Sequence, residues 1–181
     1  MRWRGAMLDI SRHYFDTTFI KKTISSLAIF DYNTLHLHLT DDQGWRLESK
    51  VFPLLHEVGS IRKQSQNNHG LLEPTYDGKQ HSGYLTHNDV REIVSHAHSL
   101  GMQVVPEINI PGHTGALLAA YPQFGVNKAT VEVSGRWGIS DYLLRPFPET
   151  FDFLTKVFEE VASNFPSEYI HVGGDESLID N

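Results

Sequence analysis

Four short apolar runs alternate along this chain with patterns typical of amphipathic helices. The runs lie near Trp3–Ile10, Asn33–Leu39, Met102–Ile108 and Glu168–Val172, and the helical patterns cover Thr17–Phe30, Thr86–Leu100 and Pro148–Asn164. Strands that alternate with helices indicate parallel β/α units.

Local signals mark where the helices begin and end. Asp16 is a predicted N-cap for the first helix, and the second helix is capped at Thr86 and closed by Gly101. The segment Trp45–Leu85 is irregular and rich in Gly, Asn, His and Pro. It is longer than a packing connection needs, so we expect a functional loop there.

The expected fold class is therefore α/β, as a TIM-type (β/α)8 barrel of which this chain covers about the first four β/α units. A complete barrel typically needs about 250 residues, and this chain has 181. We expect residues 1–181 to be the N-terminal half of one catalytic domain, with no second domain. A doubly wound open sheet is the alternative, but no glycine fingerprint for a nucleotide follows the first strand.

Composition narrows the classes of function. A formal net charge of -7 with 15 Lys and Arg residues offers no basic surface for nucleic acid, so we expect no nucleic-acid partner. No run approaches the roughly 20 apolar residues of a membrane span. The chain has no cysteine, which excludes disulfides, thiol catalysis and thiolate metal sites.

Polar side chains follow each predicted strand at its carboxyl end. They are Arg12, Asp41, His113 and the neighbouring pair Asp175 and Glu176. Active sites of (β/α)8 barrels are built from those strand ends, so we expect these residues to lie close together.

Asp175 and Glu176 are the first candidates for catalysis. They follow Gly173 and Gly174 at the end of an apolar run. Two neighbouring carboxyl groups in a pocket tend to have separated pKa values, which provides one acid and one anion near neutral pH. The alternative is a solvated loop that happens to carry two acids.

Arg12 and His113 are candidates for binding and orientation. The guanidinium fork of Arg12 could bind two hydroxyl groups or a carboxylate, although a structural ion pair is about equally compatible with its position. His113 could orient a carboxylate across the site, but a single histidine after a turn is more often structural. Trp3, Trp45 and Trp137 could pack against sugar faces, and none is assigned to a ligand.

A rival hypothesis is a barrel metallohydrolase. His36 and His38 share one face of a strand, and Asp41 follows closely, as in a metal-ligand cluster. Leu35, Leu37 and Leu39 would then face the helices, which is equally expected of a structural strand with satisfied core histidines.

Four ordered motifs resemble one enzyme family. They are Arg4-Gly5-Ala6-Met7-Leu8-Asp9-Ile10-Ser11-Arg12-His13, Leu35-His36-Leu37-His38-Leu39-Thr40-Asp41-Asp42-Gln43-Gly44-Trp45-Arg46, Pro106-Glu107-Ile108-Asn109-Ile110-Pro111-Gly112-His113 and His171-Val172-Gly173-Gly174-Asp175-Glu176. Together they resemble the β-N-acetylhexosaminidases of glycoside hydrolase family 20. The resemblance spreads over nearly the whole chain.

The resemblance implies a (β/α)8 domain that removes terminal, non-reducing β-linked N-acetylglucosamine or N-acetylgalactosamine from glycans. It also implies a retaining mechanism in which the substrate supplies its own nucleophile. The 2-acetamido oxygen attacks the anomeric carbon and forms an oxazolinium-type intermediate. No metal and no organic cofactor are implied.

The same resemblance implies a role for each site residue. Glu176 would be the general acid and then the base, and Asp175 would orient the acetamido group. Arg12 would bind hydroxyls of the terminal sugar, with Asp41 and His113 as a polar pair behind the acid. Asn109 stands where many members carry Asp, so we expect it to keep a hydrogen bond to a neighbouring histidine without the charge.

Two other interpretations remain. One is a noncatalytic sugar-binding module or pseudoenzyme, which would keep Arg12 and the aromatic residues without needing an acid. The other is that this chain alone is inactive or aggregates, because a half barrel exposes strand edges and a flank of its core. The pocket residues of later strands would be required, so the remaining half of the barrel is an expected partner.

Overall fold

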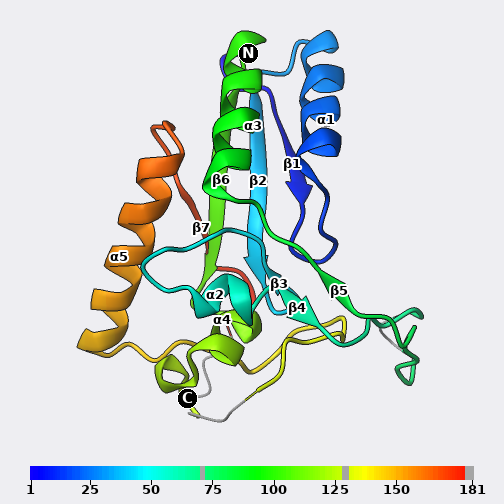
Figure 1. Ribbon diagram of the computed structural model, residues 1–181, viewed down its shortest axis with the longest axis vertical. Helices are drawn as coiled ribbons and strands as arrows, with labels where there is room; N and C mark the ends of the chain where they lie inside the picture. Colours follow the sequence, from blue (N-terminus) through cyan, green and yellow to red (C-terminus); the bar gives the residue numbers. More distant parts are fainter. Residues whose placement is uncertain (70–71, 128–130, 178–181) are drawn as a thin grey trace.

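A parallel sheet forms the centre of the molecule in the computed structural model, which describes residues 1–69, 72–127 and 131–177. Its strands are β1 (Gly5–Asp9), β2 (Thr34–Asp41), β6 (Gln103–Ile110) and β7 (His171–Gly173), hydrogen-bonded in that order. These three pairings are parallel (Figure 1). A fifth, two-residue strand pairs antiparallel with the end of β2. The predicted β/α units are confirmed, although β7 begins later than the apolar run Glu168–Val172 suggested.

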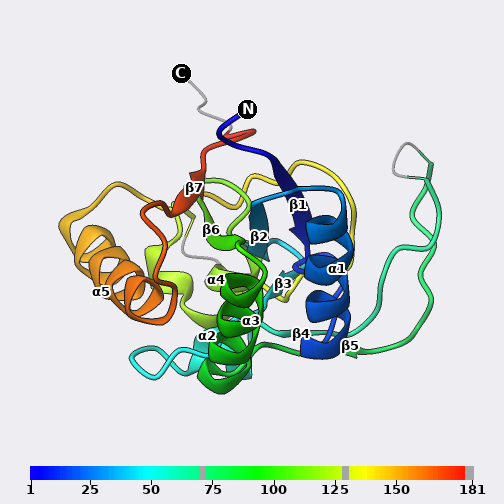
Figure 2. The same ribbon diagram turned by 90° about the horizontal axis from the view of Figure 1, so that it is seen from above.

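Three helices connect these strands and cover one face of the sheet. They are α1 (Thr17–Ile29), α3 (His87–Ser99) and α5 (Pro148–Asn164), which lie in a row beneath the strands (Figure 2). A connection that leaves each strand, forms a helix and returns to a parallel neighbour is the repeating unit of α/β folds.

The caps predicted from the sequence are present. The side chain of Asp16 accepts a hydrogen bond from the backbone N–H of Phe19, at 2.8 Å. Thr86 and Asp89 form a reciprocal capping box at the start of α3. Gly101 closes that helix with a φ of 72°, a conformation that glycine adopts without a Cβ clash.

Successive side chains of β2 point to opposite faces of the sheet, so its leucines lie on one face and its histidines on the other. Leu35, Leu37 and Leu39 are completely buried in the core shared with the helices. His36 and His38 therefore lie on the opposite, inner face of the sheet. This burial stabilises the strand, because each buried leucine side chain contributes about 1.5–3 kcal/mol relative to an exposed one.

Several short elements lie beyond the carboxyl ends of the strands, and the sequence patterns did not predict them. They are β3 (Gly44–Trp45), α2 (Leu54–Glu57), β4 (Ile61–Arg62), β5 (His81–Ser82), α4 (Gly115–Ala120) and the 3-10 helix η1 (Pro122–Phe124). Of these elements, α2, β4 and β5 order part of the irregular segment Trp45–Leu85.

A buried arginine holds these loops together. The guanidinium of Arg46 is inaccessible to solvent and donates hydrogen bonds to the backbone carbonyls of Ser11, Ser60 and Gly83. These carbonyls belong to three separate loops, so one side chain connects segments that are far apart in the sequence. The long loop is thereby anchored beside the strand ends.

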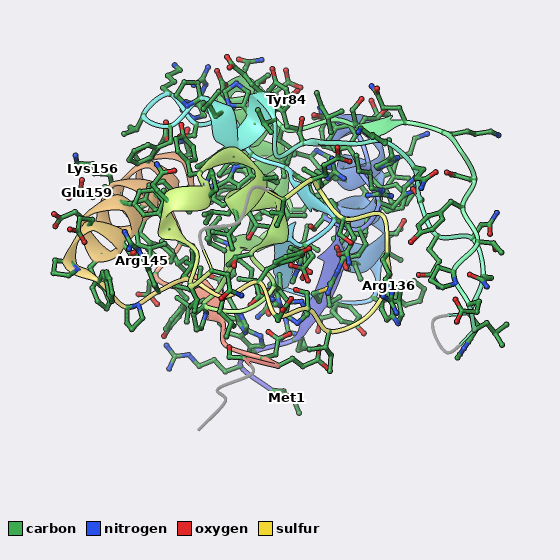
Figure 3. All side chains as sticks on the ribbon, turned by 90° about the horizontal axis from the view of Figure 1, so that it is seen from below. Met1, Tyr84, Arg136, Arg145, Lys156 and Glu159 are labelled. Atoms are coloured by element: carbon green, nitrogen blue, oxygen red, sulfur yellow. The ribbon has the colours of Figure 1, made fainter. Side chains whose placement is uncertain are left out.

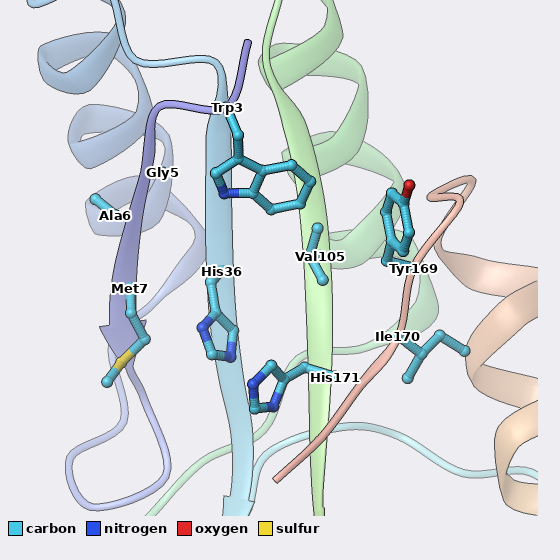
Figure 4. A pocket seen from close by; sticks show the side chains of 9 residues that line it. All are labelled: Trp3, Gly5, Ala6, Met7, His36, Val105, Tyr169, Ile170 and His171. Carbon is cyan, nitrogen blue, oxygen red and sulfur yellow. The ribbon is translucent and has the colours of Figure 1, made fainter. Parts of the chain in front are cut away.

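The inner face of the sheet bears an open groove. It lies between β1 and β7, has a volume of about 640 Å³ and is lined by Trp3, Met7, His36, Tyr169 and His171, among others (Figure 4). β1 and β7 are the outer strands of the described sheet. In the described part of the chain, no helix has both the length and the apolar character needed to cross a bilayer.

Candidate active site

The predicted site residues gather at one edge of the sheet because the four strands are parallel. Arg12 follows β1, Asp41 ends β2, His113 follows β6, and Asp175 and Glu176 follow β7. Parallel strands place their carboxyl ends on the same side, so residues separated by up to 164 positions become neighbours.

Asp41 is a deeply buried charge at this edge. Its side chain has no solvent-accessible surface, and its Oδ2 lies 2.8 Å from Nη2 of Arg12 and 2.9 Å from Nε2 of His38. Burial acts to raise the pKa of Asp41, but contacts with His113, His38 and Arg12 lower that pKa to about 2. Asp41 is therefore an anion at neutral pH.

Arg12 is held by protein partners on each part of its guanidinium. Nη1 lies 2.8 Å from Asp9 Oδ2, and Nε donates to Gln43 Oε1 at 3.0 Å. Burial lowers the pKa of Arg12, but Asp41 and Asp9 raise it overall. The side chain is still 28% exposed. Arg12 therefore forms structural ion pairs and still exposes part of its side chain to the oxygen atoms of a ligand.

His113 connects Asp41 to the pair of acids. Its buried Nδ1 lies 3.2 Å from Asp41 Oδ1 and 3.4 Å from Asp42 Oδ2, as an ion pair without a directed hydrogen bond. Nε2 lies 3.1 Å from Glu176 Oε2 and 3.3 Å from Asp175 Oδ2. Contacts with Asp41 and then Asp42 raise the pKa of His113 to about 10 against the effect of burial.

Glu176 and Asp175 lie at the surface of this network. Their side chains are 50% and 56% exposed, which leaves carboxyl oxygens available to a ligand. Glu176 and His113 both have a positive φ, 49° and 54°. Left-handed backbone in non-glycine residues is uncommon and concentrates at functional sites.

The two glycines before the acids are required by the turn. Gly173 and Gly174 have φ values of 69° and 93°, and a Cβ on Gly173 would collide with the side chain of Asn109. The backbone can therefore pass close to β6 only without a side chain at this position.

Asn109 differs from the sequence prediction. Its Oδ1 accepts a hydrogen bond from the N–H of Gly174 at 3.4 Å, and its buried Nδ2 has no hydrogen-bond partner among the described residues. The expected hydrogen bond to a histidine is thus not found in the described structure. The close approach of the Gly173 turn directs the amide oxygen toward the backbone instead.

The sequence reasoning missed a second group of polar residues on the inner face. Glu107 of β6 is buried, and its Oε2 lies 2.5 Å from His36 Nε2 and 2.8 Å from His38 Nδ1. Its Oε1 lies 3.3 Å from Nδ1 of His171. A charged residue within the otherwise apolar run of β6 was the signal that could have identified this group.

Asp42 was also missed as a site residue. Asp42 accepts hydrogen bonds from the N–H of Gly115, at the start of α4, and from the hydroxyl of Ser140. The guanidinium of Arg12 lies 6.0 Å from the centre of the Trp137 ring. Of the three tryptophans, Trp137 is thus the one beside the candidate site, whereas Trp45 is buried in the core.

Three clusters of His, Asp and Glu could in principle hold a metal ion in the described structure. They are His36 with Glu107 and His171, Asp41 with Asp42 and His113, and His113 with Asp175 and Glu176. In each cluster the imidazole nitrogens face the carboxylates directly, at 2.5–3.4 Å. The predicted trio of His36, His38 and Asp41 is not one of these clusters. We interpret the contacts as hydrogen bonds and ion pairs.

Comparisons with known proteins agree on one family. The model described as "Glycosyl hydrolase family 20, catalytic domain" matches residues 1–181. A "Beta-hexosaminidase" of Vibrio furnissii is 39% identical over 97% of this chain, and one of Porphyromonas gingivalis is 42% identical over 96%. The chain spans only 29% and 21% of the length of these two relatives.

Solved structures give the same result. A crystal structure of a β-N-acetylhexosaminidase matches with a TM-score of 0.90 and 39% identity, covering 97% of this chain and 36% of that one. The family 20 β-N-acetylhexosaminidase of Streptomyces coelicolor matches with a TM-score of 0.84 and 36% identity, covering 96% of this chain and 33% of that one.

Proposed function

This chain belongs to glycosyl hydrolase family 20, and we propose that the protein containing it removes terminal β-linked N-acetylhexosamine residues from glycans. The fold of the family is a TIM-type barrel, and the parallel sheet with its helices is part of one. We further propose that residues 1–181 form the first four β/α units of the barrel domain. A polypeptide that joins this chain to the remaining strands is called the complete enzyme below.

One observation carries the proposal. Glu176, His113 and Asp41 form a continuous series of contacts at the carboxyl edge of the sheet, and Arg12 closes the series at Asp41. The partly exposed carboxyl group of Glu176 is thus backed by the buried His113 and Asp41. A glycosidase needs such a group to protonate the leaving oxygen.

In the proposed mechanism, Glu176 is the general acid and then the general base. The acetamido oxygen of the sugar forms a bond to the anomeric carbon while the glycosidic C–O bond breaks, and Glu176 gives its proton to the leaving oxygen. Water then attacks the anomeric carbon of the oxazolinium-type intermediate, and Glu176 takes a proton from that water. The bond between the anomeric carbon and the acetamido oxygen breaks in this step, which restores the neutral acetamide. Oε2 of Glu176 contacts Nε2 of His113, and half of the Glu176 side chain is exposed, so its carboxyl group is accessible for this exchange.

Asp175 is the proposed partner of the acetamido group. Its carboxylate would orient the group for attack and stabilise the positive charge that develops on its nitrogen. Asp175 lies next to Glu176 and shares the contact with His113. The two carboxyl groups therefore have different tasks, because one must carry a proton and the other must remain ionised.

Arg12 is the proposed ligand of the terminal sugar's hydroxyl groups. We expect Arg12→Lys in the complete enzyme to raise KM about tenfold with a smaller change in kcat, since lysine keeps the charge but loses the planar fork. Steady-state kinetics with a nitrophenyl N-acetylglucosaminide measures both constants. Arg91→Lys, on the exposed face of α3, is the matched control, and an unchanged KM in Arg12→Lys would contradict the assignment.

The proposal also predicts that activity needs no metal ion. The mechanism uses carboxyl groups and the substrate's own acetamide, so we expect incubation with EDTA followed by buffer exchange to leave kcat/KM unchanged. Loss of activity that added zinc restores would favour the metallohydrolase hypothesis. A noncatalytic sugar-binding protein would instead bind N-acetylglucosamine without any hydrolysis by the complete enzyme.

A further inference from the structure

His38 lies behind the proposed site and touches a carboxylate with each ring nitrogen. Nε2 is 2.9 Å from Asp41 Oδ2, and Nδ1 is 2.8 Å from Glu107 Oε2. The side chain is only 6% exposed. His38 therefore connects the site at the strand ends with the polar cluster on the inner face of the sheet, where His36 and His171 lie against each other (Figure 4).

This geometry fits only one charge state of the ring when both carboxylates are ionised. A neutral imidazole has one N–H donor and one nitrogen with a lone pair, so one of its nitrogens would face a carboxylate without a proton between them. An imidazolium donates from both nitrogens and satisfies both carboxylates. The two short contacts therefore indicate that His38 is a cation.

The surroundings of His38 support the same charge. Burial lowers the pKa of His38, but hydrogen bonds with Asp41 and Glu107 raise it to about 9. Burial raises the pKa of Glu107, but His36 and His38 lower it well below its ordinary value. Among the described residues, other charged or titratable groups around this unit are Asp9 near His38, Arg12 and His113 on Asp41, and His171 on Glu107.

We infer that His38 is a positioning residue for catalysis, which holds Asp41 in place and compensates part of its charge behind His113 and Glu176. Asp41 uses Oδ2 for both Arg12 and His38 and presents Oδ1 to His113. Oδ1 also accepts a hydrogen bond from the backbone N–H of Asp42 at 2.7 Å. Loss of the His38 donor would remove one of the two described contacts of Oδ2, and Arg12 would remain as the other. The inference deepens the proposed function and rests on it.

The test is His38→Gln in the complete enzyme, with kcat and KM measured from pH 4 to pH 10. Removal of the cation leaves more of the negative charge of Asp41 uncompensated, which favours the protonated form of His113. We expect the basic limb of the kcat/KM profile to move up by about one pH unit and kcat to fall about tenfold. KM should change less than twofold, because buried His38 does not reach the substrate.

The matched control is His36→Gln. His36 also contacts Glu107 and lies on the same strand face, but its described contacts do not include Asp41. We expect it to keep the wild-type pH profile. An unshifted profile in His38→Gln, or an equal shift in His36→Gln, would overturn the inference, whereas an inactive wild-type complete enzyme would overturn the proposed function instead.

A second measurement covers the case in which His38→Gln does not fold. Neutron diffraction from deuterium-exchanged crystals of the wild-type complete enzyme locates the protons on the ring. We expect deuterium on both Nδ1 and Nε2 of His38. A ring nitrogen without deuterium would mean that the imidazole is neutral, and the inference would fail.

Discussion

Replacement of Glu176 by Gln in the complete enzyme is expected to lower kcat on a glycan by about 10²–10⁴-fold, the usual contribution of a general acid–base group. Glutamine keeps the size of the side chain and can still contact Nε2 of His113, but it has no proton to transfer. Binding of N-acetylglucosamine should persist because Arg12 and Asp175 are unchanged. Steady-state kinetics and calorimetric titration measure the two effects.

A comparison of two substrates with different leaving groups tests the role of Glu176 as the acid more directly. A nitrophenolate leaves without full protonation, so Glu176→Gln should impair the first chemical step on a nitrophenyl substrate less than on a glycan. Equal losses on both substrates in single-turnover reactions would contradict the role of Glu176 as the acid. Glu159→Gln removes an exposed carboxylate on the outer side of α5 (Figure 3) and should retain wild-type kinetics.

Replacement of Asp41 by Asn is expected to destabilise the complete enzyme by about 3–5 kcal/mol, the usual effect of removing one partner from a buried charge cluster. Asp41 has no solvent-accessible side-chain surface and compensates Arg12, His38 and His113. The amide would leave three cationic groups without their shared anion. Chemical denaturation at pH 6, followed by fluorescence, measures the difference in the free energy of unfolding.

The pH dependence of this difference has a definite sign. The pKa of Asp41 is lowered in the folded state, so its contribution is complete above pH 4 and is lost as the pH falls toward 2. The pKa values of His38 and His113 are raised, so their contributions are complete below about pH 6.5 and are lost as the pH rises through 9 to 10.

The difference between wild type and Asp41→Asn should therefore be largest between about pH 4 and 6.5. Asp152→Asn, at an exposed position of α5, is the control and should change stability by less than about 0.5 kcal/mol. A constant difference from pH 2 to pH 10 would show that Asp41 does not interact with these ionisable groups.

Much of the fold was predictable because its signals are local. The alternation of β2, the N-cap at Asp16 and the capping box at Thr86 each depend on residues a few positions apart. These signals were confirmed. Short elements such as α4, β3 and β4 were missed, because they are held by distant groups, for example the side chain of Asp42 at the N-terminus of α4.

The site was predictable in part for a topological reason. Parallel strands bring their carboxyl ends together, so Arg12, Asp41, His113 and Glu176 could be expected at one edge. Which atoms meet could not be derived in this way. Asn109 bonds the backbone of Gly174 instead of a histidine, and His38 belongs to the network although its spacing with His36 suggested a metal pair.

By itself, the sequence determined the order of the β/α units, the caps of the helices and the edge at which the acids lie, because these follow from local periodicity and strand direction. Only the tertiary structure decided the partners of the buried charges. The contact of Glu107 with His36 and His38 joins residues about 70 positions apart, at distances set by the spacing and register of β2 and β6. Charge states in a buried cluster depend on such distances, and no local pattern encodes them.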